Sequence, residues 1–352
     1  MISLFFKRCA PFSSCSLTFL SVIILSIINI NISSVNCHPL DSYFRAMSTN
    51  PIVTPQWLMQ NVNKVRLIDA TYAPTATRDY KEFKTKCYGN FDLLTKNNTV
   101  AAYTGEHIPG AAHFGLDSAY FPSQYIKFDL YPPEHFEKYL RLLGINNDEQ
   151  VVIYSRGPAA GMMFASRAYW TLKAYGLTNL SLLNGGLDAW KAAGGPTDNS
   201  VVTPKLGNVN VKSLDNTILA KFEEIPFNEF AENKVDYLDA RTTPQFTGEE
   251  PLNKTFPDTK ATGSHVTGAI SFPMAKVIGP DGFISQQDVD AQIANLGLKS
   301  GNQVYVACNT GIQASVIFVA LERSGIKAKL YNGSMTELAS RAPELVNATG
   351  NN

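Results

Sequence analysis

The stretch VYVACNTGIQASVIFVAL, residues 304–321, holds two apolar runs separated by a short polar turn with a single glycine. The first run predicts a buried strand that ends at Cys308, and the second predicts a buried helix. Backbone N–H groups at such a turn, together with the positive end of the helix dipole, favour an anion beside them. We therefore expect Cys308 to carry a thiolate, which is the nucleophilic form of cysteine.

The cysteine count leaves a simpler interpretation open, because a lone cysteine at a strand end is usually a small buried hydrophobe. Of the five cysteines, Cys87 and Cys308 stand in the body of the chain, and the other three lie near its N-terminus. This pattern implies no disulfide framework. A bridge between Cys87 and Cys308 is an alternative that would disable the turn.

The composition is that of a globular protein with enough chain for two domains, since 45% of its 352 residues are apolar and 17% are charged. The 30 basic residues balance the 30 acidic ones, so the formal net charge is zero. This balance gives no indication of a nucleic-acid partner.

Residues 1–46 differ in pattern from the rest of the chain. Two basic residues precede an apolar stretch at about residues 17–30, and no acidic residue appears before position 41. We interpret this segment as a secretory leader, because its apolar core has the length of a signal, and we expect no stable membrane span after its removal. A mitochondrial leader, an uncleaved anchor and a cytosolic product that starts at Met47 are the alternatives.

The body of the chain repeats itself once, because four sequence blocks recur in the same order, as in a duplicated domain. We predict a first domain at residues 52–195, a linker at 196–216 and a second domain at 217–346. The matched blocks are LIDA 67–70 with YLDA 237–240, GEHIPGA 105–111 with GSHVTGA 263–269, VVIYS 151–155 with VYVAC 304–308, and LNGG 183–186 with YNGS 331–334.

Short apolar runs alternate with helical patterns in both copies, which predicts an α/β fold with a mostly parallel sheet and helices on both faces in each domain. Ligands of such sheets bind outside the carboxyl ends of the strands, where Cys308 lies. Its counterpart in the first copy is Ser155. The predicted strands are Val65–Ala70, Gln150–Ser155, Leu180–Asn184, Val235–Ala240, Ala269–Phe272, Gln303–Cys308 and Ala328–Tyr331, and the predicted helices are Pro133–Leu143, Ala160–Tyr175, Gln287–Leu296 and Ile312–Ser324.

The repeated blocks and the Cys-x-x-Gly-x-x-Ala turn together resemble the tandem-domain rhodanese family, the thiosulfate and 3-mercaptopyruvate sulfurtransferases. The resemblance extends from about Ile52 to Val346. It implies that the Cys308 thiolate takes a sulfane sulfur from a small donor, holds it as a persulfide and passes it to cyanide, a thiol or thioredoxin. It implies neither a metal nor an organic cofactor.

The resemblance also assigns roles to individual residues. The neutral pair Asn309-Thr310 favours the mercaptopyruvate type, in which Thr310, His107 and Asp79 would assist proton transfer. His107 has a structural interpretation as well, because His265 occupies the equivalent place in the second copy. The turn would hold the persulfide anion through the backbone amides of Asn309, Gly311, Ile312, Gln313 and Ala314.

The chain departs from the family where an arginine is expected to bind the donor's anionic group. Gln245 stands at that position, and Lys254 matches a second basic position further on. Losing one arginine weakens the binding of a carboxylate or sulfonate, because a neutral amide replaces a bidentate cation. We expect Arg241 itself to have a structural role within its own domain. Residues 84–104 form an insertion that could border the cleft.

Two rival functions have different requirements. A phosphatase with a cysteine in an anion-binding loop needs an arginine six residues after the cysteine, but position 314 is alanine and the loop is too short. The alternative that stays open is a weakly active persulfide carrier, or a binding module of the same fold, since Gln245 replaces the expected arginine.

Overall fold

Two parallel sheets of five strands each organise the described part of the chain, residues 51–75 and 78–350 of a computed structural model. The first sheet has the order β1-β5-β4-β2-β3, and the second has the order β6-β12-β11-β7-β8. All strand pairs within the two sheets are parallel. The expected α/β class with two similar halves is confirmed, and the sequence repeat is a repeat of topology.

The predicted strands are all present, with ends that agree within about one residue. The two-residue strand β8 was predicted at Ala269–Phe272, but sequence patterns missed the other two-residue strands, because so short a strand has no periodicity to detect. The domain limits 52–195 and 217–346 stay a prediction. The strands are β1 (Ile52–Val53), β2 (Val65–Asp69), β3 (Ala112–His113), β4 (Gln150–Tyr154), β5 (Leu180–Leu183), β6 (Leu219–Ala220), β7 (Asp236–Asp239), β8 (Ile270–Ser271), β11 (Val304–Ala307) and β12 (Ala328–Tyr331), with an antiparallel pair of β9 (Ile278–Gly279) and β10 (Gly282–Phe283).

Helices surround both sheets, and the four that the sequence predicted are α8, α9, α13 and α14. The helices of the first half are α3 (Pro55–Asn61), α4 (Tyr80–Lys86), α5 (Phe91–Asn97), α6 (Ala101–Gly105), α7 (Leu116–Ala119), α8 (Pro133–Leu142), α9 (Met162–Ala174) and α10 (Gly186–Ala192). Those of the second half are α11 (Thr243–Thr247), α12 (Leu252–Thr255), α13 (Gln286–Ala294), α14 (Ile312–Arg323) and α15 (Ser334–Arg341).

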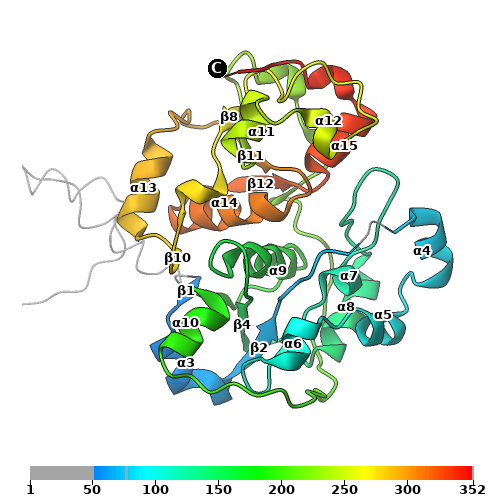
Figure 1. Cartoon of the computed structure of the whole chain (residues 1–352), viewed down its shortest axis with the longest axis vertical. Coiled ribbons are helices and arrows are strands. Elements are labelled where there is room, and N and C mark those ends of the chain that lie inside the picture. The colour runs from blue at the N-terminus through cyan, green and yellow to red at the C-terminus, as the bar shows by residue number, and fades with distance from the viewer. Residues whose placement is uncertain (1–50, 76–77, 351–352) are drawn as a thin grey trace, which may run out of the picture. The chain divides into compact units, whose positions relative to one another are not determined.

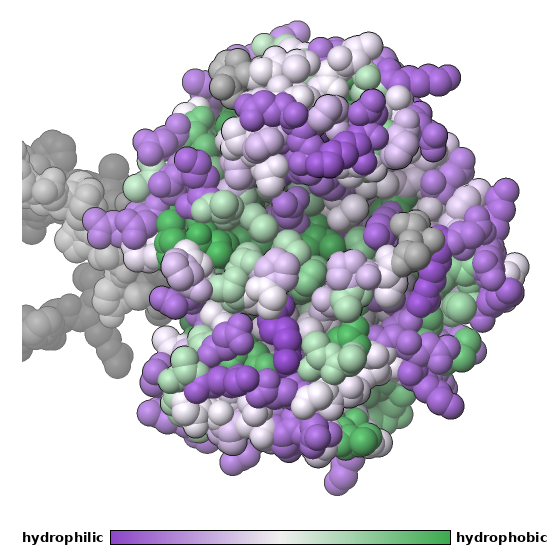
Figure 2. Space-filling view, viewed as in Figure 1, coloured by the Kyte–Doolittle hydropathy of each residue, from purple (hydrophilic) through white to green (hydrophobic). Residues whose placement is uncertain are grey.

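Helices α9 and α14 pack against each other between the two sheets (Figure 1). The first lies on β4 and β5, and the second lies on β11 and β12. Both helices are apolar around most of their circumference, as expected of helices covered on opposite sides. Residues of both halves form one continuous apolar core, and in Figure 2 hydrophobic surface gathers in a band at the level of these helices.

Polar contacts add to this packing at the far end of α14. Lys173 Nζ lies 2.8 Å from Glu322 Oε1, and the Tyr169 hydroxyl donates to Glu322 Oε2 at 3.0 Å. Trp170, which is fully buried in α9, donates its indole N–H to the carbonyl of Ile218 at 3.4 Å. The two halves are thus joined by direct side-chain contacts.

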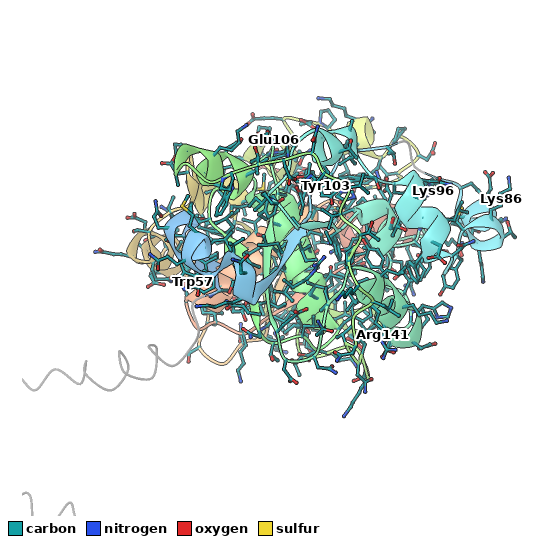
Figure 3. All side chains as sticks on the ribbon, turned by 90° about the horizontal axis from the view of Figure 1, so that it is seen from below. Trp57, Lys86, Lys96, Tyr103, Glu106 and Arg141 are labelled. Atoms are coloured by element: carbon teal, nitrogen blue, oxygen red, sulfur yellow. The ribbon has the colours of Figure 1, made fainter. Side chains whose placement is uncertain are left out.

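The insertion at residues 84–104 forms short helices rather than a loop. Helix α5 buries Phe91 and Leu94 against the first domain. Lys86 and Lys96 project from this segment on the side opposite Trp57 of α3 (Figure 3).

The leader predicted at residues 1–46 lies outside the described residues. In the part that the structure does describe, no helix combines the length and the apolar character needed to cross a bilayer.

Replacing Trp170 with alanine should lower the free energy of unfolding by about 3–5 kcal/mol, because it removes a large side chain from a fully buried site between the halves. Urea denaturation followed by circular dichroism measures the change. Leu206→Ala is the matched control, because Leu206 is 71% exposed, and its effect should stay within about 0.5 kcal/mol. Equal effects of the two substitutions would contradict the packing described here.

Candidate active site

Cys308 follows β11 directly, at the carboxyl edge of the second sheet. The turn is short, because α14 begins at Ile312 after Gly311, whose φ of 79° lies in the left-handed region that glycine adopts without strain. The Cys308 side chain is a free thiol and is only 2% exposed. The expected strand, turn and helix are therefore present, and the alternative bridge to Cys87 does not form.

The first turn of α15 braces the cysteine from the other side. Ser334 Oγ accepts the backbone N–H of Cys308 at 3.2 Å, and the N–H of Met335 donates to the Cys308 carbonyl at 2.9 Å. The hydroxyl of Thr336 donates to the carbonyl of Asn309 at 2.7 Å. These bonds fix the backbone on both sides of the thiol.

The backbone amides of Asn309, Thr310 and Gly311 donate to no acceptor within the described residues. They are followed by the N-terminal end of α14, a helix of 12 residues. Free N–H groups and the positive end of a helix dipole together stabilise an anion. The turn is therefore suited to hold a thiolate or a persulfide anion on Cys308.

The first domain has a different turn at the equivalent place. It runs from Ser155 to Gly161 before α9 begins, and is thus longer than the turn at Cys308. The Ser155 hydroxyl donates to the carbonyl of Gly161 at 2.6 Å and is fully buried. This serine is engaged within its own turn, and the turn carries no thiol.

Gln245 lies beside the Cys308 turn, as the sequence predicted. Asn309 Nδ2 donates to Gln245 Oε1 at 3.4 Å, and Gln245 Nε2 donates to Glu250 Oε1 at 3.1 Å. Glu250 also forms an ion pair with Lys254, with its Oε2 atom 3.6 Å from Nζ. The cation that was expected to bind the donor is thus paired with a carboxylate that sequence reasoning had missed.

Arg241 is structural, as the sequence suggested. Its guanidinium forms an ion pair with Asp239 at 2.6 Å and donates to the carbonyl of Ser264 at 2.7 Å. Burial opposes the positive charge, but attraction to Asp239 and the hydrogen bonds with it outweigh burial and raise the pKa of Arg241. A pair neutralised in this way leaves little charge for a substrate.

His107 is fully buried, and its contacts lie within the first domain. Its Nδ1 atom is 2.9 Å from the carbonyl of Tyr103, its ring stacks on Tyr103, and its Nε2 atom is 3.3 Å from Asp198 Oδ1. His107 and Asp198 also form an antiparallel bridge that ties the linker to the domain. His265 forms the same kind of bridge with Ala348 and stacks on Phe246. The geometry supports a structural role for His107, and its role in proton transfer stays a prediction.

Asp79 caps helix α4. Its carboxylate accepts the N–H groups of Lys81 at 3.0 Å and Glu82 at 2.8 Å, which is the common use of aspartate at a helix start. Thr310 is half-buried in the turn beside Cys308. The structure thus places Thr310, Gln245 and Asn309 at the cysteine, whereas the contacts of Asp79 and His107 lie within the first domain.

Comparisons with known proteins agree with this geometry. The family model "Rhodanese-like domain" matches residues 54–193. The Caenorhabditis elegans protein mpst-4, named as a thiosulfate sulfurtransferase, is 35% identical over 301 residues, which cover 86% of this chain and 88% of the relative. The chain belongs to the rhodanese family.

A further relative and a solved structure extend this comparison. The 3-mercaptopyruvate sulfurtransferase of Escherichia coli K12 is 25% identical over 84% of this chain and 97% of the relative. The crystal structure of SseA from Escherichia coli shares the fold, with a TM-score of 0.63 and 23% identity over 81% of this chain and 99% of that chain. The protein is a sulfurtransferase, with a small sulfur donor and an acceptor as its substrates.

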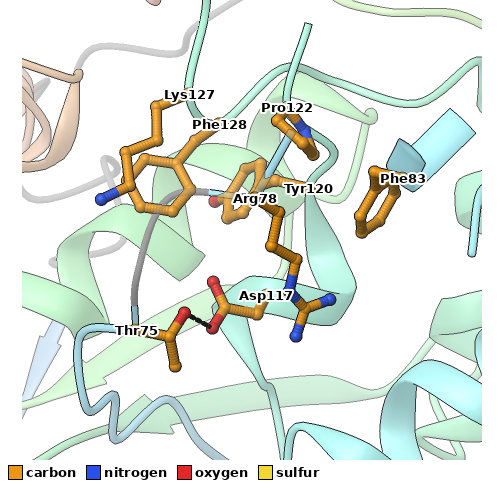
Figure 4. A pocket seen from close by; sticks show the side chains of 8 residues that line it. All are labelled: Thr75, Arg78, Phe83, Asp117, Tyr120, Pro122, Lys127 and Phe128. Atoms are coloured by element: carbon orange, nitrogen blue, oxygen red, sulfur yellow. Dashed lines mark hydrogen bonds between the residues drawn. The ribbon is translucent and has the colours of Figure 1, made fainter. Parts of the chain in front are cut away.

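Figure 4 shows a pocket of the first domain, whose residue Phe128 contacts Asn332 in the loop after β12. Phe128 forms one wall, and its carbonyl accepts a hydrogen bond from Asn332 Nδ2 at 3.0 Å. Arg78 and Lys127 bring two positive charges to the same pocket, and Asp117 accepts a hydrogen bond from Thr75 at 2.8 Å. Sequence reasoning missed this pocket, because no motif marks its residues, which come together only when the first domain folds.

Replacing Gly311 with alanine should reduce sulfur transfer about tenfold or more, a barrier increase of roughly 1.4 kcal/mol. An added Cβ would lie 2.7 Å from Arg167 Nη1, and the turn would have to move. Steady-state rates with both donors measure the effect.

Gly325→Ala is the matched control, because Gly325 follows α14, has a φ of 74° and has open space around its Cβ position. Both substitutions should cost about 1 kcal/mol of stability through the left-handed backbone. Only Gly311→Ala should also reduce the rate, and equal rates would show that the turn tolerates displacement.

Proposed function

We propose that this protein moves a sulfane sulfur from 3-mercaptopyruvate or thiosulfate to a thiophilic acceptor through a persulfide on Cys308. The observation that carries the proposal is the buried free thiol at the start of α14, beside three backbone amides that have no acceptor among the described residues. The two relatives described above are named for thiosulfate and for 3-mercaptopyruvate, and these names suggest the two donors.

The first half-reaction forms a sulfur–sulfur bond at Cys308. The thiolate attacks the sulfur of 3-mercaptopyruvate, and the carbon–sulfur bond breaks with its electron pair on carbon. The leaving group is the enolate of pyruvate, which takes up a proton as the new persulfide loses one. With thiosulfate the sulfur–sulfur bond breaks instead, and sulfite leaves.

The second half-reaction restores the thiolate. Cyanide, a thiol or thioredoxin attacks the outer sulfur and leaves as thiocyanate or a persulfide. This is a two-step covalent scheme with a stored intermediate, and the turn amides serve both half-reactions because thiolate and persulfide are anions at the same place.

The neutral segment at residues 245–254, beside the turn, favours 3-mercaptopyruvate over thiosulfate. Gln245 is uncharged, and Glu250 pairs with Lys254, so no unpaired cation of this segment faces the turn. Thiosulfate carries two negative charges and needs such a cation more than a monoanion does. Thr310, with His107 and Asp79, remains our proposal for proton transfer to the enolate.

Replacing Cys308 with serine should abolish sulfur transfer with both donors, because a hydroxyl cannot store a sulfane sulfur. Exposure of the parent protein to either donor should add one sulfur to the Cys308 peptide, as read by mass spectrometry. Cys87→Ser is the control and should keep the parent rate. An unmodified Cys308 after treatment with both donors would exclude the persulfide scheme and leave the binding-module alternative.

The double substitution Gln245→Arg with Glu250→Gln should lower the Michaelis constant for thiosulfate about tenfold. A bidentate cation contributes about 1–3 kcal/mol to binding an anion, and the second change prevents Glu250 from pairing with the new arginine. Gln245→Arg alone should do less, because Glu250 Oε1 already lies 3.1 Å from the side chain at position 245. Unchanged constants in both variants would show that position 245 does not contact the donor.

A further inference from the structure

Arg167 of helix α9 is a fully buried arginine that reaches from the first domain to the Cys308 turn. Its Nη1 atom donates to the carbonyl of Gly311 at 3.4 Å, and its Nη2 atom donates to Asn332 Oδ1 at 2.6 Å. Gly311 ends the turn that starts at Cys308, and Asn332 stands two residues before Ser334, which accepts the Cys308 N–H. One guanidinium therefore joins the two loops that hold the cysteine.

The rest of the guanidinium is bound by neutral groups. Its Nε atom donates to the Tyr120 hydroxyl at 3.0 Å, and Nη2 also donates to the carbonyl of Phe128 at 3.3 Å. The ring faces of Tyr120 and Trp170 lie 4.6 and 4.8 Å from its central carbon. Among the described residues, no carboxylate forms an ion pair with Arg167.

Other charged groups near the two loops are already engaged. On β7 and beyond it, Asp239 is paired with Arg241, and on α15 Glu337 is paired with Arg341. Next to Phe128, Asp129 interacts with Arg167 only through space, and burial raises the pKa of its carboxyl. The Tyr237 and Tyr120 hydroxyls have pKa values raised by burial, so neither supplies an anion at neutral pH. Arg167 is thus a positive charge with no anion bound to it.

A buried charge that forms no ion pair among the described residues is costly, and an apolar residue would fill the same space at less cost. A buried positive charge becomes favourable when an anion forms nearby, because two opposite charges attract strongly over a short distance in a low-dielectric interior.

We propose that Arg167 is the positioning residue of this active site, holding both loops in register and stabilising the Cys308 thiolate and persulfide by its charge. The inference rests on the proposed persulfide chemistry and extends it, because it gives the first domain a part in a reaction whose thiol lies in the second.

The test is the pH dependence of Cys308 alkylation in the full chain, with iodoacetamide as the probe and the Cys308 peptide followed by mass spectrometry. Arg167→Met should raise the midpoint of the rate profile by about one pH unit, the size expected for loss of a nearby opposite charge. Arg167→Lys should recover most of this shift, because it keeps the charge but loses the forked hydrogen bonds. A purely structural role predicts that the lysine variant behaves like the methionine variant.

Two further variants keep Arg167 in place. They test whether its charge acts on Cys308 even if Arg167→Met fails to fold. Asn332→Asp adds a carboxylate to the atom that Arg167 contacts at 2.6 Å, and should raise the midpoint. Asn332→Ala loses the bonds to both Arg167 and Phe128 without adding a charge. If the midpoint rises only because these bonds are lost, it should rise at least as far in Asn332→Ala as in Asn332→Asp, and a larger rise in Asn332→Asp is the effect of the added charge. Lys173→Met removes another α9 cation that contacts α14, and should leave the midpoint unchanged.

This inference is overturned if Cys308 is alkylated with the same midpoint pH in Arg167→Met and Asn332→Asp as in the parent protein, even if Cys308 still takes up sulfur. Conversely, the persulfide scheme fails if the parent Cys308 takes up no sulfur from either donor. The alkylation profile and the sulfur transfer are separate measurements, so the two failures can be told apart.

Discussion

The packing of α9 against α14 is the contact on which the rest of the structure depends. Each helix covers one face of its own sheet, and neither could expose its second apolar face to water without a large cost in free energy. Pressing them together joins both halves in one core. It also sets Arg167 of α9 beside Gly311 at the start of α14, so the same burial that stabilises the molecule completes the surroundings of the thiol.

Duplication has produced two turns with one topology and different chemistry. The shorter turn keeps its amides free and carries Cys308, whereas the longer turn of the first domain binds its own serine hydroxyl. The first domain contributes through side chains that cross the interface instead. Its turn forms hydrogen bonds within itself. Its helix α9 carries Arg167, which contacts Gly311 of the second domain.

The electrostatics of the site follow from which cations are paired. Arg241 and Lys254 have carboxylate partners, and Gln245 has no charge. Arg167 and the pair Arg78 and Lys127 in the neighbouring pocket come from the first domain. Arg241 and Lys254 of the second domain are thus paired, and Arg167, which has no ion-paired carboxylate among the described residues, belongs to the domain that lacks the thiol.

Local pattern determined the strands, the main helices, the duplication and the cysteine turn, because each of these depends on residues close together in the chain. The family followed from motifs of the same kind, and so did the position of Gln245 beside the turn. Tertiary structure decided the two-residue strands other than β8. It also decided the structural contacts of His107 and Asp79 and the partners of Glu250 and Arg167. Arg167 and Gly311 are 144 positions apart, and a contact over that separation exists only because two apolar helices had to be buried against each other.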